Sequence, residues 1–410
     1  MTTASIPNSK ASSISENLFL QLLDRYLVDA KIRFLGQGLD SIVGNHNNEV
    51  PDKPYDVAIN VHHSRFFLRV LAYGNLGLGE AFIARDFDVV EGTLQDFLSI
   101  LLRNKLDKKV KKDIPLALKI FGIQLGNLLR GEQQNVQRHY DIGDDLFEAF
   151  LDPTLTYSCG YALSPEDSLE QLQLNKLERI CQKLKLKPGD HLLDIGCGFG
   201  GLLLYAAKNY GVTGIGITTS KRHCERGNEN IFKTGLTDQI QIQFRDHRSI
   251  DGSFDKVVSV GMMEHLPRKE YGCYIRNIAQ VLTPQGMGLI HAIGCNTSKN
   301  KHDPFIQKYI FPGSGQPKLS EISMQLERNH LATLDVENIV RHYGYTTRRW
   351  LQNFQANKNT LDANHYDDQF MRMWEYYLCC GIAAAFVSES AVYQVLFTKD
   401  HTAHIPLQRV

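Results

Sequence analysis

Long hydrophobic runs are missing from this chain of 410 residues. No stretch of about 18 apolar residues occurs, so we expect no segment that spans a bilayer. The mean hydropathy of −0.26 agrees with that expectation. The opening residues MTTASIPNSKASSISENLF also lack a basic start followed by an apolar stretch, so they do not resemble a secretory signal. These absences predict a cytoplasmic protein.

Cysteine pairs with metal-ligand spacing are absent as well. The eight cysteines are scattered, and none forms a CxxC motif. A zinc cage and a disulfide framework are therefore not indicated, and we predict no metal site. The cysteines are expected to be reduced thiols, as is usual in the cytosol.

The chain has no excess of charge of either sign. Lys and Arg together number 45, and Asp and Glu together number 45. No global field therefore steers the protein toward nucleic acid, and we predict no nucleic-acid partner. The length exceeds what one hydrophobic core normally supports, which favours two domains.

The pattern along the chain predicts four regions. Residues 1–16 are rich in Ser, Thr and Asn and are expected to form a disordered tail. Residues 17–102 alternate short apolar and helical stretches, which predicts an α+β accessory domain. Residues 103–130 are expected to form a basic linker or helix, and residues 131–410 a second, larger domain.

The basic stretch from Arg103 to Lys112 has two interpretations. It contains six basic residues and the acid Asp107, with Asp113 following. It is either a solvated helix face or linker, or a patch that attracts anionic lipid.

From about residue 165, apolar strands alternate with segments of helical periodicity. The strand candidates are HLLDIG, VTGIGIT, IQIQFRD, KVVSVG and MGLIHAIG. This alternation predicts an α/β fold with a doubly wound, mainly parallel sheet. Ligands of such sheets bind at the carboxyl ends of the strands.

A glycine-rich turn, DIGCGFGG, follows the first of these strands and begins at Asp194. Glycines there permit positive φ and close approach of a ligand to the backbone. The spacing is GxGxG led by an acid, and Thr218 and Thr219 stand where NAD enzymes place a ribose-binding carboxylate. This pattern favours S-adenosylmethionine over NAD, and a methyltransferase over a dehydrogenase.

Nine motifs in order resemble the cyclopropane-fatty-acid synthases and the related mycolic-acid methyltransferases, over nearly the whole chain. They are RFFLRVLAYGNLGLGEAF, QRHYDIGDDLFEAFLDPTLTYSCGY, KLKPGDHLLDIGCGFGG, YGVTGIGITTS, VGMMEHL, LIHAIG, FIQKYIFPG, VENIVRHYGYTTRRW and MWEYYL. The resemblance implies a Rossmann-like methyltransferase domain that transfers a methylene from S-adenosylmethionine to the cis double bond of a phospholipid acyl chain. It also implies a homodimer that associates peripherally with the inner face of the membrane.

The resemblance further implies which residues form the site. A bicarbonate ion is the base in that family, and its cradle corresponds to Cys159, Glu264, His291, Ile293 and Tyr343. The contacts with S-adenosylmethionine correspond to Tyr157, Ser158, Gln173, Asp194, Gly196, Gly198, Thr218 and Thr219. Between residues 144 and 243, four positions depart from the family pattern, namely Asp144, Phe199 in place of tryptophan, His223 in place of glutamine, and Gln243. Near the C-terminus, the family's recurrent cysteine position falls on Gly381, with Cys380 beside it.

The chemistry explains why such residues are needed. An alkene that attacks a sulfonium methyl group requires aligned, water-free proximity. The carbocation that develops is stabilised by aromatic faces, and ring closure needs a base. The aromatic candidates are Tyr157, Tyr161, Phe199, Tyr309, Phe311 and Tyr343.

Two other functions remain open. One is a fatty-acyl C-methyltransferase that forms a methyl or methylene branch. The other is an inactive lipid-binding relative that kept the fold.

Overall fold

The computed structural model describes residues 9–45, 54–113, 143–297, 303–387 and 390–402, together with positions 120 and 122. Most of the predicted linker beyond Asp113 and the QRHYDI part of the second motif lie outside these residues. The chain divides into two compact units. The first unit comprises residues 1–141, 303–312 and 361–387, and the second unit comprises residues 142–302, 313–360 and 388–410.

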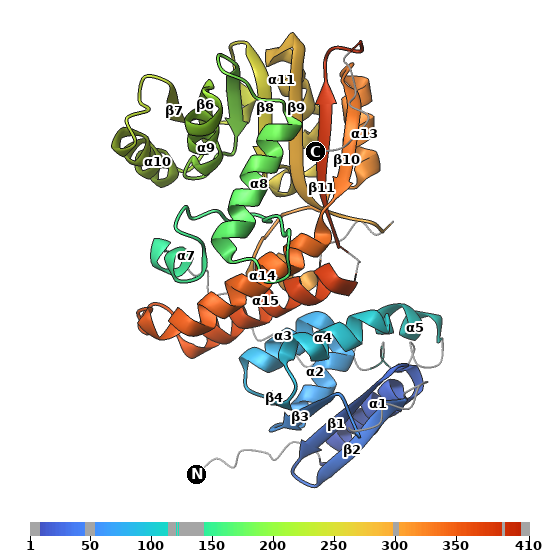
Figure 1. The fold of residues 1–410 in the computed structure, drawn as a ribbon. Helices are drawn as coiled ribbons and strands as arrows, with labels where there is room; N and C mark the ends of the chain where they lie inside the picture. Colours follow the sequence, from blue (N-terminus) through green and yellow to red (C-terminus); the bar gives the residue numbers. More distant parts are fainter. Residues whose placement is uncertain are drawn as a thin grey trace, which may run out of the picture. The chain divides into compact units, whose positions relative to one another are not determined.

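The first unit contains a four-stranded sheet in the order β2-β1-β3-β4 (Figure 1). Strand β1 is antiparallel to β2 and parallel to β3, and β4 is antiparallel to β3. Alternate residues of β1 are buried, which gives one face of the sheet to the core. The strands are β1 (Ala30–Gly36), β2 (Leu39–Asn45), β3 (Val57–Val61) and β4 (Phe87–Glu91).

The helices of the first unit enclose an aromatic core. The Phe66 ring lies 5.4 Å from Phe19 and 5.0 Å from Phe87, measured between centroids. Helix α1 begins at Ser9, so residues 9–16 are helical, which differs from the predicted tail. The helices are α1 (Ser9–Tyr26), α2 (Arg65–Tyr73), α3 (Asn75–Ile83), α4 (Leu94–Arg103), α5 (Leu106–Lys112), α12 (Pro304–Tyr309) and α15 (Asp368–Val387).

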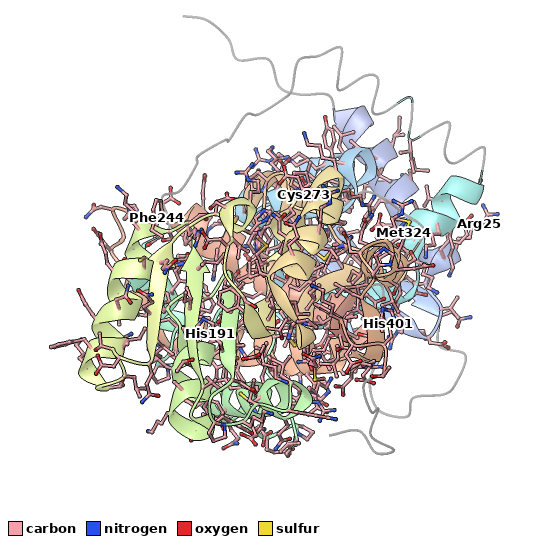
Figure 2. The ribbon with its side chains drawn as sticks, turned by 90° about the horizontal axis from the view of Figure 1, so that it is seen from above. Arg25, His191, Phe244, Cys273, Met324 and His401 are labelled. Atoms are coloured by element: carbon pink, nitrogen blue, oxygen red, sulfur yellow. The ribbon has the colours of Figure 1, made fainter. Side chains whose placement is uncertain are left out.

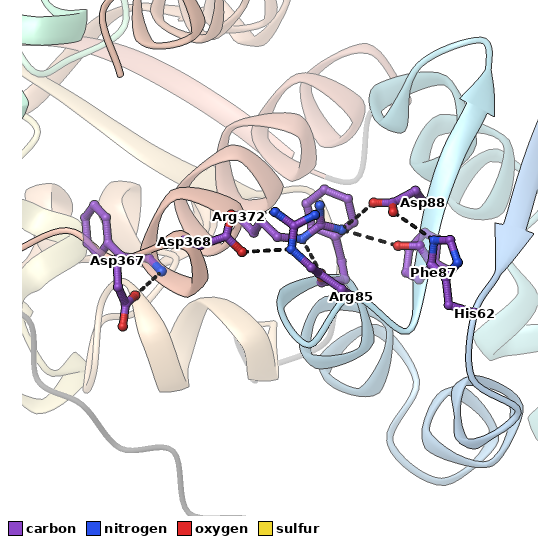
Figure 3. Close-up of polar contacts among 9 residues, drawn as sticks. His62, Arg85, Phe87, Asp88, Asp367, Asp368 and Arg372 are labelled. Atoms are coloured by element: carbon purple, nitrogen blue, oxygen red, sulfur yellow. Dashed lines mark hydrogen bonds and ion pairs between the residues drawn. The ribbon is translucent and has the colours of Figure 1, made fainter. Parts of the chain in front are cut away.

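Helices α12 and α15 belong to the first unit although they follow the second unit's first segment in sequence. The Arg372 guanidinium of α15 donates to the carbonyl of Phe82 at 2.6 Å and to Asp88 at 2.8 Å (Figure 3). Arg85 forms an ion pair with Asp368 at 2.6 Å. This division differs from the continuous 131–410 domain predicted, because an apolar helical pattern does not reveal which core the helix completes.

The second unit contains a seven-stranded sheet in the order β10-β11-β9-β8-β5-β6-β7. Strands β5 to β9 are parallel, and β11 runs antiparallel to both β9 and β10. The predicted fold class, α/β with a mainly parallel sheet and a smaller α+β part, is confirmed. The strands are β5 (His191–Ile195), β6 (Thr213–Thr218), β7 (Ile240–Phe244), β8 (Phe254–Val260), β9 (Leu282–Cys295), β10 (Ala332–Asn338) and β11 (Ser390–Thr398).

Serine caps begin two helices of the second unit, α8 and α10. Ser168 accepts a hydrogen bond from the Gln171 N–H and begins α8, whose apolar stripe is buried. The α-helices are α7 (Asp144–Phe150), α8 (Leu169–Lys183), α9 (Gly201–Tyr210), α10 (Lys221–Lys233), α11 (Tyr271–Val281), α13 (Leu319–Arg328) and α14 (Val340–Asn357). The 3₁₀ turns are η1 (His247–Ser249), η2 (Met263–His265), η3 (Arg268–Glu270) and η4 (Lys358–Thr360).

Aromatic side chains lie at both ends of the parallel strands. His191 (Figure 2) opens β5. Its ring stacks on that of Phe254, which opens β8, with centroids 4.8 Å apart. Phe244 ends the edge strand β7 at the opposite end and is more than half exposed. Among the helices that the structure describes, none has the length and apolar character needed to cross a bilayer.

Candidate functional site

A cavity of about 640 Å³ lies at the carboxyl ends of β5 and β6, and we call it the β5–β6 cavity. It lies where a doubly wound sheet places its ligand. Of the residues predicted to bind S-adenosylmethionine, those that line it are Tyr157, Ser158, Asp194, Gly196, Gly198, Thr218 and Thr219. The structure thus brings together residues from three separate motifs.

The glycine turn adopts the backbone conformation that its sequence predicts. Gly196 has φ of 77° and Gly198 has φ of 55°, and side chains rarely adopt such values. A Cβ atom at Gly196 would lie 3.0 Å from Met262, whereas one at Gly198 would meet nothing within 4 Å. Gly198 therefore leaves open space in the cavity wall that a ligand can occupy.

Asp194 is almost fully buried at the end of β5. Burial raises the pKa of its carboxyl to about 7, and the nearby charge of Lys176 opposes that rise. Lys176 is itself buried, lines the cavity, and donates from Nζ to Ser158 Oγ at 3.0 Å. Sequence reasoning missed Lys176.

Gln173 does not line the cavity. Its Nε2 donates to the carbonyl of Ser158 at 3.0 Å and to that of Thr156 at 3.3 Å. It therefore supports the segment that carries Tyr157 rather than facing the cavity. The spacing of Gln173 and Lys176, three residues apart on α8, is the signal that points to a shared helix face.

Three of the four positions that depart from the family pattern lie together. The rings of Phe199 and His223 have centroids 4.4 Å apart, and both line the cavity. Burial lowers the pKa of His223. Asp144 forms ion pairs with Arg222 at 2.5 Å and Arg226 at 3.0 Å, and Arg226 lies over the Phe199 ring.

Gln243 occupies a different place from those three. It lies in β7 opposite Ile217 and is not among the residues that line the cavity.

Glu264 and Ile293 of the predicted cradle are in direct contact. The Ile293 N–H donates to Glu264 Oε1 at 3.1 Å. Glu264 is buried, and its Oε2 has no hydrogen-bond partner among the described residues. Burial raises the pKa of the carboxyl to about 7.

His291 is buried in β9 opposite Gln394 of β11. Gln394 Nε2 lies 3.4 Å from His291 Nδ1, and an amide nitrogen can only donate. Burial lowers the pKa of His291 to about 3, so the ring is neutral. With the Gln394 amide in this orientation, Nδ1 accepts and Nε2 carries the proton. That Nε2 has no partner among the described residues. Gln394 carries no motif signal, and sequence reasoning missed it.

Cys159 and Tyr343 are joined through α14. Cys159 is buried, and burial raises the pKa of its thiol, so it stays protonated. The N–H of Gly160 donates to Thr346 Oγ1 on α14 at 3.0 Å. Tyr343, one turn earlier on α14, packs against Trp350 with ring centroids 5.9 Å apart.

The predicted cradle adjoins the β5–β6 cavity without lining it. The N–H of Gly261, a cavity residue, donates to the carbonyl of His291 at 2.8 Å. A Cβ atom at Gly261 would lie 3.9 Å from Glu264 Oε1. Gly261 therefore connects Glu264 and His291 of the predicted cradle to the cavity wall.

The aromatic candidates do not all gather at the site. Tyr157 and Phe199 line the cavity. Tyr161 instead stacks on His342 with centroids 4.1 Å apart. Tyr309 and Phe311 belong to the first unit, where Tyr309 donates to Glu80 and Phe311 packs against Tyr377.

Comparisons with known proteins agree with this geometry. The family profile described as "Mycolic acid cyclopropane synthetase" matches residues 128–395. The chain is 37% identical over 343 residues to the cyclopropane-fatty-acyl-phospholipid synthase of Escherichia coli K12, covering 83% of this chain and 87% of that relative. It is 35% identical to a probable fatty acid methyltransferase of Pseudomonas putida, covering 63% and 66% respectively.

Solved structures show the same fold. The cyclopropane synthase MmaA2 from Mycobacterium tuberculosis aligns with a TM-score of 0.60 and 26% identity, covering 64% of this chain and 96% of that one. The mycolic acid cyclopropane synthase CmaA1 in complex with SAH and CTAB aligns with a TM-score of 0.59 and 27% identity, covering 64% and 97%.

Proposed function

Because the chain belongs to the mycolic acid cyclopropane synthetase family and is an S-adenosylmethionine-dependent methyltransferase, we propose that its substrate is the cis double bond of phospholipid acyl chains and its product a cyclopropane ring. The family and the enzyme class, both predicted from the sequence, are confirmed. The observation that carries the proposal is that two buried polar atoms, Glu264 Oε2 and His291 Nε2, have no partner among the described residues, while both residues adjoin Gly261 of the cavity wall.

The residues of the β5–β6 cavity fit S-adenosylmethionine. The open space at Gly198 admits a ligand, and the Thr218 and Thr219 segment places no carboxylate at the end of β6. Asp194 offers a partly ionised carboxyl. S-adenosylmethionine, when bound, supplies an electrophilic methyl group. The chain's own task is to hold the reactants aligned and away from water.

The aromatic faces stabilise positive charge on the acyl chain. Tyr157 packs against Trp350, with centroids 5.1 Å apart, and is held between Phe147 and Phe150. Phe199 also lines the β5–β6 cavity. Such rings attract a cation through their faces and offer no nucleophile that would trap it.

The predicted cradle fits a bicarbonate ion. Glu264 Oε2 and His291 Nε2 are buried polar atoms without a partner among the described residues. Such atoms destabilise the folded protein unless a bound ligand forms hydrogen bonds with them. Bicarbonate, when bound, supplies the base for the proton lost in ring closure. Glu264, His291 and Tyr343 would hold the anion: the Glu264 carboxylate would accept a hydrogen bond from its hydroxyl, and His291 Nε2–H and the Tyr343 hydroxyl would donate to its oxygens. Gln394 holds His291 in the donating tautomer.

Lipid mass spectrometry tests the proposal. The protein is incubated with S-adenosylmethionine and vesicles of unsaturated phospholipid. We expect the lipid to gain the mass of one CH₂ unit. We also expect the product to contain no double bond that hydrogenation can reduce. A retained, reducible double bond would instead indicate the methylene-branched product of a fatty-acyl C-methyltransferase, and no mass gain would indicate an inactive relative.

Two observations favour the C-methyltransferase alternative. Phe199 and His223 replace the tryptophan and glutamine of the family pattern inside the β5–β6 cavity, which changes the shape of its wall. The similarity to a probable fatty acid methyltransferase also fits this alternative.

Bicarbonate dependence is tested separately. Activity is compared in rigorously depleted buffer and in the same buffer after bicarbonate is restored. We expect activity to fall on depletion and to return on addition. Gln394→Leu should raise the bicarbonate concentration needed for half-maximal rate, because His291 loses its fixed tautomer. Full activity after depletion would show that a side chain takes the proton.

Membrane association and dimerisation complete the proposal. The substrate lies in a bilayer, so the protein docks reversibly on the inner membrane surface. Vesicle cosedimentation and light scattering test the two properties, and a monomer mass at working concentration would contradict the dimer.

A further inference from the structure

Helix α8 carries a buried positive charge that the reaction described above does not use. Lys176 is 2% exposed, although lysine is almost never fully buried without a partner. Its ammonium lines the β5–β6 cavity and donates to Ser158 Oγ at 3.0 Å. Burying a lysine ammonium destabilises the folded protein unless its charge is compensated by other groups.

The surroundings of Lys176 come from several elements. Asp152 and Cys159 lie in the same motif, Asp194 lies near the end of β5, and His291 lies in β9. Each of these groups interacts electrostatically with the ammonium. Asp152 in turn accepts hydrogen bonds from backbone N–H groups of its own turn. Lys176 therefore contacts the segment that carries Ser158 and interacts electrostatically with Asp194 of the glycine-turn segment, and both segments line the cavity.

We propose that Lys176 is a positioning residue for S-adenosylmethionine binding. Its ammonium fixes the Ser158 side chain on one segment and favours the ionised carboxylate of Asp194 on the other. Gln173, one turn earlier on α8, anchors the backbone of the first segment through the Thr156 and Ser158 carbonyls. One face of α8 thus holds the backbone of the segment from Thr156 to Ser158 and the side chain of Ser158. This fixes the segment relative to the glycine turn.

The charge state of Lys176 gives the inference a pH signature. Burial lowers the pKa of Lys176 to about 8, and the neighbouring Asp152 and Asp194 oppose that change. As pH rises through about 8, the folded protein loses this proton, and the hold on Asp194 weakens. Ligand affinity should therefore fall on the alkaline side in the wild type.

The test measures binding of S-adenosylhomocysteine by calorimetry as a function of pH, with no turnover required. Lys176→Met keeps the length of the side chain and removes the charge. We expect it to weaken binding about 10- to 100-fold at neutral pH, the range for loss of a hydrogen bond to a charged group. Lys176→Arg should recover part of the affinity and shift the alkaline fall to higher pH.

Lys256→Met is the matched control. Lys256 is also a buried lysine of the second unit, with a pKa lowered by burial, but it lies outside the cavity lining. Its loss should leave affinity for S-adenosylhomocysteine within about twofold of the wild type. A Lys176→Met protein that binds as well as this control would overturn the inference.

Two further outcomes keep the test decisive. If Lys176→Met does not fold, the Lys176→Arg pH profile still decides, because an alkaline limb identical to that of the wild type contradicts a role for the charge. If the wild type itself fails to bind S-adenosylhomocysteine, the cofactor assignment of the cavity fails, and with it the inference. Binding that ignores Lys176 leaves the cofactor assignment intact and removes only the inference.

Discussion

The imidazole of His223 packs against the ring of Phe199 inside the β5–β6 cavity, with centroids 4.4 Å apart. These are two of the positions at which the chain departs from its family pattern of glutamine and tryptophan. Because the two side chains touch, the departures form one structural change and not two.

This contact predicts a coupled effect of substitution. Phe199→Trp alone should overpack against His223 and weaken S-adenosylhomocysteine binding about tenfold, as overpacking commonly costs about 1–3 kcal/mol. Phe199→Trp combined with His223→Gln should recover most of that affinity. Calorimetry of both single variants and the double variant measures the coupling. Strictly additive effects would show that the two positions are independent.

Substitution of Gly198 should remove cofactor binding while the fold survives. A valine there is strained at a φ of 55° and places its side chain in the open space of the cavity. We expect Gly198→Val to abolish detectable S-adenosylhomocysteine binding. Gly235→Val is a matched control, since Gly235 also has positive φ and open space around its Cβ position but lies outside the cavity lining. Equal loss in both variants would point to strain alone.

The raised pKa of Glu264 predicts that the free energy of unfolding depends on pH differently in the wild type and in Glu264→Gln. Burial raises its pKa from 4.5 to about 7, so the folded state keeps a proton that the unfolded state releases. The stability that this proton contributes is present below about pH 4.5 and is lost as pH rises through about 7, a change of about 3 kcal/mol at 1.36 kcal/mol per pKa unit.

Glu264→Gln cannot ionise and does not lose that contribution. Its free energy of unfolding relative to the wild type should therefore rise by about 3 kcal/mol between about pH 4 and about pH 8. Urea unfolding at both pH values measures the difference, and other buried carboxyls such as Asp194 titrate in both proteins and cancel. A difference that does not change with pH would contradict the raised pKa.

The basic segment predicts salt-sensitive membrane binding. Lys109 Nζ donates to the carbonyl of Tyr26 at 2.8 Å, so its loss would disturb the first unit itself. The useful variant therefore neutralises Lys108, Lys111 and Lys112 and keeps Lys109. Cosedimentation with anionic vesicles should weaken severalfold in this variant and in the wild type at high salt.

The control for that experiment neutralises three exposed lysines of the second unit, Lys187, Lys208 and Lys233. Its vesicle binding should match that of the wild type. If both triple variants bind equally well, the stretch from Arg103 to Lys112 is a solvated linker.

Local signals made most of the second unit predictable. The DIGCGFGG turn follows a buried strand, so its position at the carboxyl edge of the sheet could be inferred from chain order alone. Gln394 and Lys176 could not be found in this way. Gln394 meets His291 across two antiparallel strands whose pairing brings together positions 103 residues apart. Lys176 looks like any polar residue of an amphipathic helix until the fold buries it.

The placement of α15 in the first unit has a consequence for the order in which the protein is completed during synthesis. The first unit needs Arg372 over the Phe82 ring, 3.8 Å from its centroid, and Tyr376 against Phe305. A ribosome that has made the first 141 residues has therefore not yet made the pieces that close this core. The aromatic surface of the nascent chain stays open to chaperones, and to misfolding, until residues 303–312 and 361–387 have emerged.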